Sequence, residues 1–338
     1  YQCGFSSSTA FSLITPSATL YSMSLSSSVD STRTPRFRRV EPPPFALMPR
    51  DLEILQAVAG FGVIQSSQLE RLLPGSPQRL RRRLKLLFNA GYLARPRSQV
   101  AAMIAGKGSA AMAYTLTRRG AALVSGESGV TWYTQDGELS QLLHRLAITE
   151  FLVSMTVGCR ESEHLEFVPS HAVIASSPPE TRAASIPDRW QVSVRHNGTS
   201  QSLHLRADGL FAVRHRELRA AGKPSDKHFF LEIDKGTMPI TRPALSQSSI
   251  LRKLLAYGAT FRAEIHKSRF AMTKMRVLFV TETPERASHM VDAYQTHATH
   301  AAPAGLFLFT DRTSLAAAPT ILSTTWLDGE GREHTLFK

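Results

Sequence analysis

The residues of this chain best suited to chemistry are a group of carboxylates. Glu232 and Asp234 lie in and just after the apolar run 229–233, which is too short for a helix and rich in β-forming residues. This pattern predicts a buried strand. Because side chains alternate across a strand, Glu232 and Asp234 project from one face and Lys235 from the other.

Asp208 supplies a third carboxylate, at the start of a second short apolar strand at 209–213. If the two strands pair, the three carboxylates meet at one edge of a sheet. Clustered carboxylates repel one another and resist burial, and a divalent cation such as Mg²⁺ is the usual reason to tolerate them. The alternative is a set of solvated acids at strand ends, and the spacing alone favours that alternative.

Other predicted elements must position these strands. A helix at 139–157 carries His144 and Glu150, and a helix from Thr241 to about Phe261 carries Lys253 and Tyr257 at i, i+4 spacing. His144 is interpreted as a packed or hydrogen-bonded helix histidine. The remaining predicted elements are strands at 165–168, 190–194, 275–280 and 305–309, a surface loop at 176–185 and a helix at 284–297. This order predicts a mixed α/β sheet.

Composition indicates a polyanionic partner. The 338 residues include 40 Lys and Arg against 27 Asp and Glu, a net charge of +13, so nucleic acid is the first candidate and anionic lipid the alternative. No stretch approaches the ~18 apolar residues of a membrane span, so no membrane partner is expected. The two cysteines, Cys3 and Cys159, exclude a disulfide scaffold or a cysteine zinc site and fit a reducing cytoplasm.

In the N-terminal part of the chain, helix start and stop signals predict three helices, at 49–59, 66–73 and 76–90. Ser76 and Pro77 open the third helix, and leucines at 80, 84 and 87 form its apolar stripe. The rest of this helix is covered by five cations, Arg79, Arg81, Arg82, Arg83 and Lys85. The alternative interpretation is a solvated basic helix of another helical bundle, but few acids are present to pair with these cations.

Two short strands at 92–95 and 113–117 follow, and the segment between them carries further cations. Three helices and a two-stranded ribbon follow the order of a winged helix-turn-helix. In that arrangement the third helix enters the major groove and the ribbon lies on the DNA backbone. Arg95, Arg97 and Lys107 would then join the five cations of the third helix in binding DNA.

The predicted organisation is a Ser-rich and basic tail at 1–46, disordered, a winged-helix domain at 47–124, a linker at 125–138 and a second domain at 139–338. The chain starts with Tyr rather than Met. This tail would be explained if translation began upstream of the natural start, for which Met23 and Met48 are the candidates. The basic tail residues Arg33, Arg36, Arg38 and Arg39 are a further candidate contact to phosphate.

The order of the second domain, with Asp208 on one strand and Glu232 on the next, resembles the PD-(D/E)XK nuclease core. Lys253 and Tyr257 resemble the Gln-x-x-x-Tyr helix motif of one branch of that superfamily. Over residues 48–310, the winged helix, Asp208, the run 231–237 and Lys253…Tyr257 together resemble the replication-relaxation family. The resemblance implies an α+β protein with a winged helix-turn-helix followed by a mixed α/β PD-(D/E)XK-like domain. It also implies a role in plasmid replication or in relaxation of plasmid DNA during mobilisation.

The nuclease pattern is incomplete, because it places a lysine two residues after the acid, where this chain has Asp234. Lys253 would have to supply the missing cation from the next helix. If the site is active, Asp208 and Glu232 would hold Mg²⁺, with Asp234 as a further candidate ligand and Glu150 completing the metal shell. Lys253 would orient water or stabilise charge, and Asp234 and Tyr257 would belong to the catalytic set. Otherwise no cofactor is expected.

Three functions follow from these expectations. The favoured one is a cytoplasmic DNA-binding protein of a mobile element, whose partners are double-stranded DNA and a relaxase or replication protein. The second is an active Mg²⁺-dependent endonuclease, and the third is a winged-helix transcriptional regulator. A dimer is compatible with any of the three.

Overall fold

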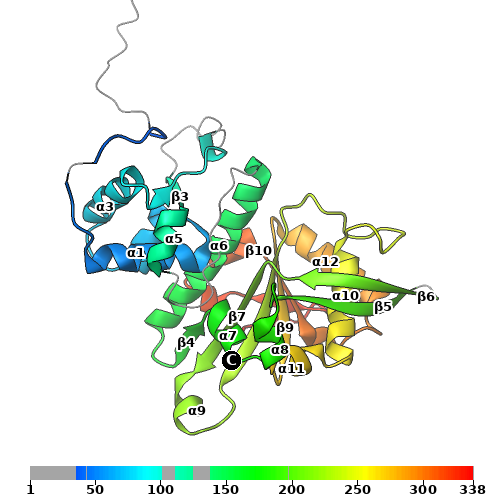
Figure 1. Ribbon diagram of the computed structural model, residues 1–338. Coiled ribbons are helices and arrows are strands. Elements are labelled where there is room, and N and C mark those ends of the chain that lie inside the picture. The colour runs from blue at the N-terminus through cyan, green and yellow to red at the C-terminus, as the bar shows by residue number, and fades with distance from the viewer. Residues whose placement is uncertain (1–35, 43, 101–110, 125–137, 197, 338) are drawn as a thin grey trace, which may run out of the picture. The chain divides into compact units, whose positions relative to one another are not determined.

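The computed structural model describes residues 36–42, 44–100, 111–124, 138–196 and 198–337. The chain separates into a unit at Tyr1–Arg38 and a unit at Arg39–Lys338, and every described helix and strand lies in the second. Most of the predicted tail, the segment with Lys107 and nearly all of the predicted linker lie outside the described residues. The second unit is a mixed α+β structure, as predicted (Figure 1).

The N-terminal domain packs helices around a small antiparallel sheet in the strand order β1-β3-β2. Its elements are α1 (Pro49–Phe61), β1 (Val63–Gln65), α2 (Ser66–Leu72), α3 (Pro77–Asn89), β2 (Leu93–Ala94), β3 (Ala113–Leu116) and α5 (Arg118–Val124). Helix α3 begins where predicted, because Pro77 occupies its first position and the Ser76 hydroxyl accepts a hydrogen bond from the Arg79 amide. Its leucine stripe is buried in the domain core.

A strap formed by residues 39–42 and 44–46, which were assigned to the tail, lies along α3. The Arg39 guanidinium sits 5.2 Å from the centre of the Phe88 ring and donates to the Leu93 carbonyl at 3.0 Å. At the other end of the strap, the Arg83 guanidinium lies 5.4 Å from the centre of the Phe45 ring. The N-terminal domain therefore begins near residue 39, earlier than the boundary expected from composition.

The C-terminal domain is built on a seven-stranded sheet in the order β12-β11-β10-β9-β8-β7-β4. Strands β8, β9 and β10 are parallel, and the strands on both sides of them are antiparallel. The strands are β4 (Leu165–Val168), β5 (Arg189–His196), β6 (Thr199–Arg206), β7 (Gly209–His215), β8 (Asp226–Ile233), β9 (Met275–Thr281), β10 (Phe307–Asp311), β11 (Trp326–Asp328) and β12 (Glu333–His334). The helices are α6 (Leu139–Glu161), α7 (Ser170–Ala175), α8 (Pro179–Ala183), α9 (Arg216–Ala220), α10 (Ile250–Arg262), α11 (Ile265–Phe270), α12 (Pro284–His297) and α13 (Arg312–Ala317), with 3₁₀ turns at Ala304–Leu306 and Ile321–Ser323.

Alternation along β8 divides the core of this domain into two layers. Phe229 and Leu231 pack with Phe151 of α6 on one face of the sheet. Phe230 packs with the α10 and α12 side chains on the other face. Glu232 has the same parity as Phe230, so it projects toward α10.

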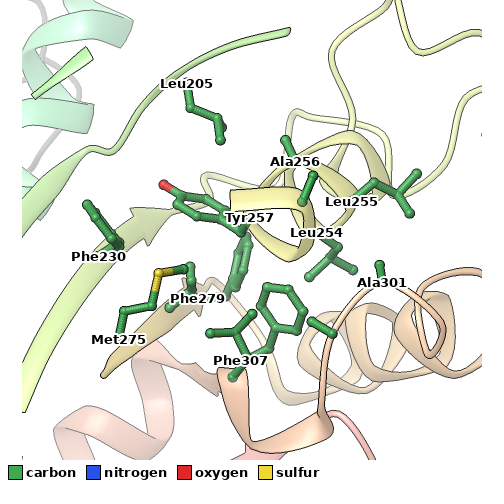
Figure 2. Close-up of a cluster of buried hydrophobic side chains, with 14 of the residues drawn as sticks. Leu205, Phe230, Leu254, Leu255, Ala256, Tyr257, Met275, Phe279, Ala301 and Phe307 are labelled. Carbon is green, nitrogen blue, oxygen red and sulfur yellow. The ribbon is translucent and has the colours of Figure 1, made fainter. Parts of the chain in front are cut away.

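The β5–β6 hairpin is separate from the main sheet and covers part of α10 (Figure 1). The Trp190 indole N–H donates to the Thr260 hydroxyl at 2.9 Å, and the ring lies 5.1 Å from that of Phe230. Figure 2 shows Leu205 of the hairpin, Phe230 of β8 and Tyr257 of α10 in the same apolar cluster. The inner face of the hairpin is thus part of the domain core.

Helix α6 is shared by the two domains. Phe151 and Met155 pack against the seven-stranded sheet, while Val153 belongs to the core of the N-terminal domain. With 23 residues and a window of mean hydropathy 1.3, α6 has the length and composition of a membrane-crossing helix. Packing in two cores accounts for this apolar character.

Helix α10 begins later than predicted. The proline at 243 suggested a helix from Thr241, but α10 starts at Ile250, and the Ser249 hydroxyl accepts from the Arg252 amide at 3.1 Å. The amide of Ile250 is bound by the Pro239 carbonyl at 3.1 Å. The preceding loop therefore satisfies the donors at the start of the helix.

The predicted loop at 176–185 contains the short helix α8.

Candidate functional site

The two strands that carry the acids pair as predicted. Strands β7 and β8 are antiparallel, with Gly209 opposite Leu231. This register places the Asp208 carboxylate beside the end of β8, where its Oδ2 atom accepts a hydrogen bond from the Ile233 amide at 2.9 Å. Asp208 and Glu232 therefore lie at the same end of the β7–β8 pair.

Glu232 is enclosed by side chains of α10. Its side chain is 2% exposed, and its Oε1 atom accepts a hydrogen bond from the Tyr257 hydroxyl at 2.5 Å. Its Oε2 atom forms an ion pair with the Lys253 ammonium. The i, i+4 spacing on α10 places both donors on the face that covers β8.

The charges of this cluster shift the pKa values of its members. Burial raises the pKa of Glu232 above its ordinary value, although Lys253 opposes the shift. Burial acts to lower the pKa of Lys253, but the charges of Glu232 and Asp208 outweigh it and raise that pKa. Burial also raises the pKa of Tyr257 well above its ordinary value. Lys253 therefore stays protonated and Tyr257 stays a hydrogen-bond donor at neutral pH.

Asp208 has a partner on α6 that was not assigned to this site. The His144 Nε2 atom lies 3.1 Å from Asp208 Oδ1, in agreement with a hydrogen-bonded helix histidine. Burial acts to raise the pKa of Asp208, but the hydrogen bond to His144 and the charge of Lys253 lower it below the ordinary value. Asp208 is therefore held as a carboxylate.

Asp234 is bound by different groups. Its carboxylate accepts hydrogen bonds from the Arg286 side chain of α12, at 2.5 and 3.0 Å, and from the Thr281 hydroxyl at 2.7 Å. Burial acts to raise the pKa of Asp234, but these hydrogen bonds lower it. The neighbouring Lys235 forms an ion pair with Glu282 at 2.8 Å. Asp234 thus ties β8 to α12.

Glu150 does not join this cluster. It accepts a hydrogen bond from Gln68 at 2.9 Å and forms an ion pair with Arg71, both on α2. Six residues separate it from His144, which rotates its side chain by about 240° around the axis of α6. Glu150 therefore links α6 to the N-terminal domain instead of facing Asp208.

The arrangement does not fit a divalent cation. Among the described residues, no three Asp, Glu, His or Cys side chains gather closely enough to hold a metal ion. All four carboxylate oxygens of Asp208 and Glu232 have protein donors, and Lys253 provides the opposing charge. Binding of Mg²⁺ by Glu232 would require the ammonium of Lys253 to move away.

A pocket of about 400 Å³ lies on the opposite face of the sheet from Lys253. It is lined by α6, by α13 and by the ends of β8 and β9, including Phe151, Ile233 and Val280. Asp208 and Glu232 do not line it. The pocket and the carboxylate cluster are therefore distinct features.

The cations of α3 form two groups. Arg81 binds Glu70 of α2 through two hydrogen bonds, at 2.7 and 3.0 Å. Arg83 forms an ion pair with the fully buried Asp51 of α1, with a hydrogen bond of 2.8 Å from its Nε atom. These two arginines hold α3 against its neighbouring helices, a role that the sequence analysis missed because both acids are distant in sequence.

Arg79, Arg82 and Lys85 form the second group. They recur every three residues along the outward face of α3, opposite the buried leucine stripe, and all three are exposed. In the part of the chain that the structure describes, their side chains have no ion-pair partner. This row of cations is available to an anionic ligand.

The predicted ribbon cations differ in their surroundings. The Arg95 guanidinium stacks 4.0 Å from the centre of the Phe88 ring and 5.3 Å from that of Tyr114, so it is held against the domain core. Arg97 is exposed. Lys107 lies outside the described residues.

Residues 55–274 match the family described as replication-relaxation. This span covers well over half of the chain and includes α3, both carboxylate strands and α10. The chain belongs to the replication-relaxation family. Neither the curated proteins nor the solved structures include a match to it.

The replication-relaxation match includes the two charged regions but not all of their partners. Asp208, Glu232, Lys253 and Tyr257 fall within the matched span, whereas Arg286, the partner of Asp234, lies beyond its end at 274. The core of the carboxylate cluster is thus inside the part of the chain that the family shares.

Proposed function

We propose that this replication-relaxation protein binds double-stranded DNA through α3 and acts in the replication or mobilisation of a plasmid. The exposed row of Arg79, Arg82 and Lys85 carries the proposal, because three cations on one helical face, without an ion-pair partner among the described residues, suit the phosphates of a duplex. The net charge of +13 supports the same kind of partner.

The order α1-β1-α2-α3-β2-β3 supports a winged helix as the DNA-binding element. In such a domain α3 would lie in the major groove, and the β2–β3 ribbon with Arg97 would approach the backbone. Helix α3 has 13 residues, about 20 Å, and the major groove of a duplex is wide enough to admit an α-helix. The paired residues Arg81 and Arg83 would fix the orientation of α3.

The second domain, in this proposal, keeps a PD-(D/E)XK-like arrangement for positioning DNA or a partner such as a relaxase or replication protein. Support comes from the pairing of Glu232 with Lys253 and Tyr257, which uses the acid as an internal anchor of α10. The alternative, an Mg²⁺-dependent endonuclease, requires Lys253 to give way to a metal ion. We expect the protein to act in the cytoplasm, where a plasmid is found.

The test is the salt dependence of affinity for duplex DNA. Replacing Arg79, Arg82 and Lys85 together with Ala should make the slope of log affinity against log salt shallower by about 2.7, since each neutralised phosphate contributes about 0.9. The matched control removes three exposed cations elsewhere, Arg219, Lys223 and Lys274, and should leave the slope unchanged. Equal effects of the two triple variants would reject α3 as the recognition helix.

A further inference from the structure

The β5–β6 hairpin presents an outer face whose composition is unusual. Alternate residues of both strands are exposed, while Trp190, Val192, Val194, Leu203 and Leu205 are buried beneath them. The outer residues are Arg189, Gln191, Ser193, Arg195, Ser200, Ser202, His204 and Arg206. All eight side chains are polar, and none is acidic.

Positive charge accumulates on this face with little local compensation. From Arg189 to Arg206 the chain contains three arginines and two histidines but no aspartate or glutamate. Arg189 and Arg206 lie directly opposite each other across the two strands, a like-charge pairing that is unfavourable in a sheet. Only Arg206 is offset, by Asp188 at 3.1 Å. Among the described residues, Arg189 and Arg195 have no ion-pair partner.

The support beneath this face is closely packed. The Trp190 ring lies 5.5 Å from that of Phe270 and 6.0 Å from that of Tyr257, in addition to its hydrogen bond to Thr260. On the outer face itself, the side chains of Gln191 and Ser202 are hydrogen-bonded across the strands at 2.5 Å. The hairpin is therefore an ordered platform for its unpaired cations.

The dimensions of the hairpin match duplex DNA. Each strand has eight residues, about 26 Å, and a two-stranded ribbon fits the major groove, which is about 12 Å wide. Arginine, glutamine and serine side chains are the donors that contact phosphates and base edges. Charge and shape thus both favour a nucleic-acid duplex over an apolar partner.

We propose that the outer face of the β5–β6 hairpin is a second binding site for duplex DNA, in which Arg189 and Arg195 contact phosphates. This inference rests on the proposed function for the identity of the ligand, but it uses residues of a different domain from α3. Cross-strand repulsion between Arg189 and Arg206 would be relieved when phosphate lies between them.

The test uses a double variant, in which Arg189→Ala and Arg195→Ala are combined. The double variant is made both in the wild-type chain and in the triple α3 variant. We expect the salt slope for a long duplex to become shallower by about 1.8 in both backgrounds, since two phosphate contacts are lost. The control is Arg219→Ala with Lys223→Ala, which removes the same charge elsewhere. Both replaced side chains are exposed, so the thermal midpoint of unfolding should stay unchanged.

The outcomes separate the two proposals. An unchanged slope and affinity in the hairpin variant, with a clear loss in the α3 variant, would overturn the second site and leave the proposed function intact. A loss in the hairpin variant with no effect of the α3 variant would keep the hairpin site and reject α3 as the recognition helix. A loss no larger than that of the control would overturn the hairpin site.

Discussion

The outward face of α3 and the Asp208–Glu232 cluster are both rich in charged side chains, but they differ in exposure and in hydrogen-bond partners. On α3, Arg79, Arg82 and Lys85 are exposed and have no ion-pair partner among the described residues. In the cluster, both carboxylates are bound by protein donors. The comparison teaches that burial forces a charge to be neutralised internally, whereas an exposed charge can stay without a protein partner and be available to a ligand.

The same contrast appears within α3 itself. Arg83 reaches the fully buried Asp51 and is committed to the fold, while Arg82, its neighbour in sequence, points outward. One residue turns the helix by about 100°, which is enough to separate a cation paired within the fold from an exposed one. A count of cations along a helix therefore overestimates the number that remain available to an anionic ligand.

Replacing Lys253 with Ala should give the largest effect on this comparison. Glu232 would remain buried without its opposing charge, and the free energy of unfolding should fall by about 3–5 kcal/mol. Urea denaturation measures the change. Lys274→Ala is the control, because Lys274 is exposed, and it should change the free energy of unfolding by less than about 0.5 kcal/mol.

A second variant makes the Lys253 experiment specific. Combining Lys253→Ala with Glu232→Gln removes both charges and keeps an acceptor for the Tyr257 hydroxyl. Part of the lost stability should return if the uncompensated carboxylate is the cause. If Lys253→Ala costs no more than the control, the view of Glu232 and Lys253 as an internal anchor is incorrect.

Replacing Glu70 with Gln should convert one structural cation of α3 into a binding one. Arg81 loses its charged partner, so its guanidinium becomes available to phosphate. We expect the salt slope of duplex affinity to become steeper by about 0.9, the contribution of one more contact. Glu53→Gln, which frees Arg50 of α1 instead, is the matched control. A slope that does not change would show that Arg81 lies outside the DNA interface.

The smallest expected effect is on DNA cleavage. Supercoiled plasmid incubated with the protein and Mg²⁺ or Mn²⁺ should be retarded on a gel but remain uncut, because Lys253 and Tyr257 already engage Glu232. The Glu232→Ala variant and a chelator lane are the controls. Metal-dependent nicking that disappears in the variant would establish the endonuclease alternative. It would also show that the Asp208–Glu232 cluster acts on a ligand, as is proposed for α3.

Local sequence signals predicted much of the fold. The strand with Glu232, the strand led by Asp208 and the leucine stripe of α3 were recognised because alternation and helical periodicity are local patterns. The spacing of Lys253 and Tyr257 correctly indicated a shared helical face. The predicted start of α10 was wrong because Thr241 and the proline at 243 were taken to open the helix, whereas Ser249 is the cap.

Pairings between distant residues could not be predicted in the same way. Arg286 binds Asp234 from 52 residues away, and Gln68 binds Glu150 from 82 residues away. Such contacts depend on how layers pack, and a single sequence carries no local pattern for them. Glu150 was therefore expected at the metal, whereas the structure places it against α2.

Helix α6 has a consequence for how this protein can exchange parts with its relatives. The Thr149 hydroxyl donates to the Val63 carbonyl at 2.8 Å, and the Arg160 side chain donates to the carbonyls of Arg71 and Leu72. Recombination between mobile elements at 125–137 would separate the N-terminal domain from the helix that completes its core. We expect viable hybrids to inherit α6 together with the N-terminal domain, with crossover points after Glu161.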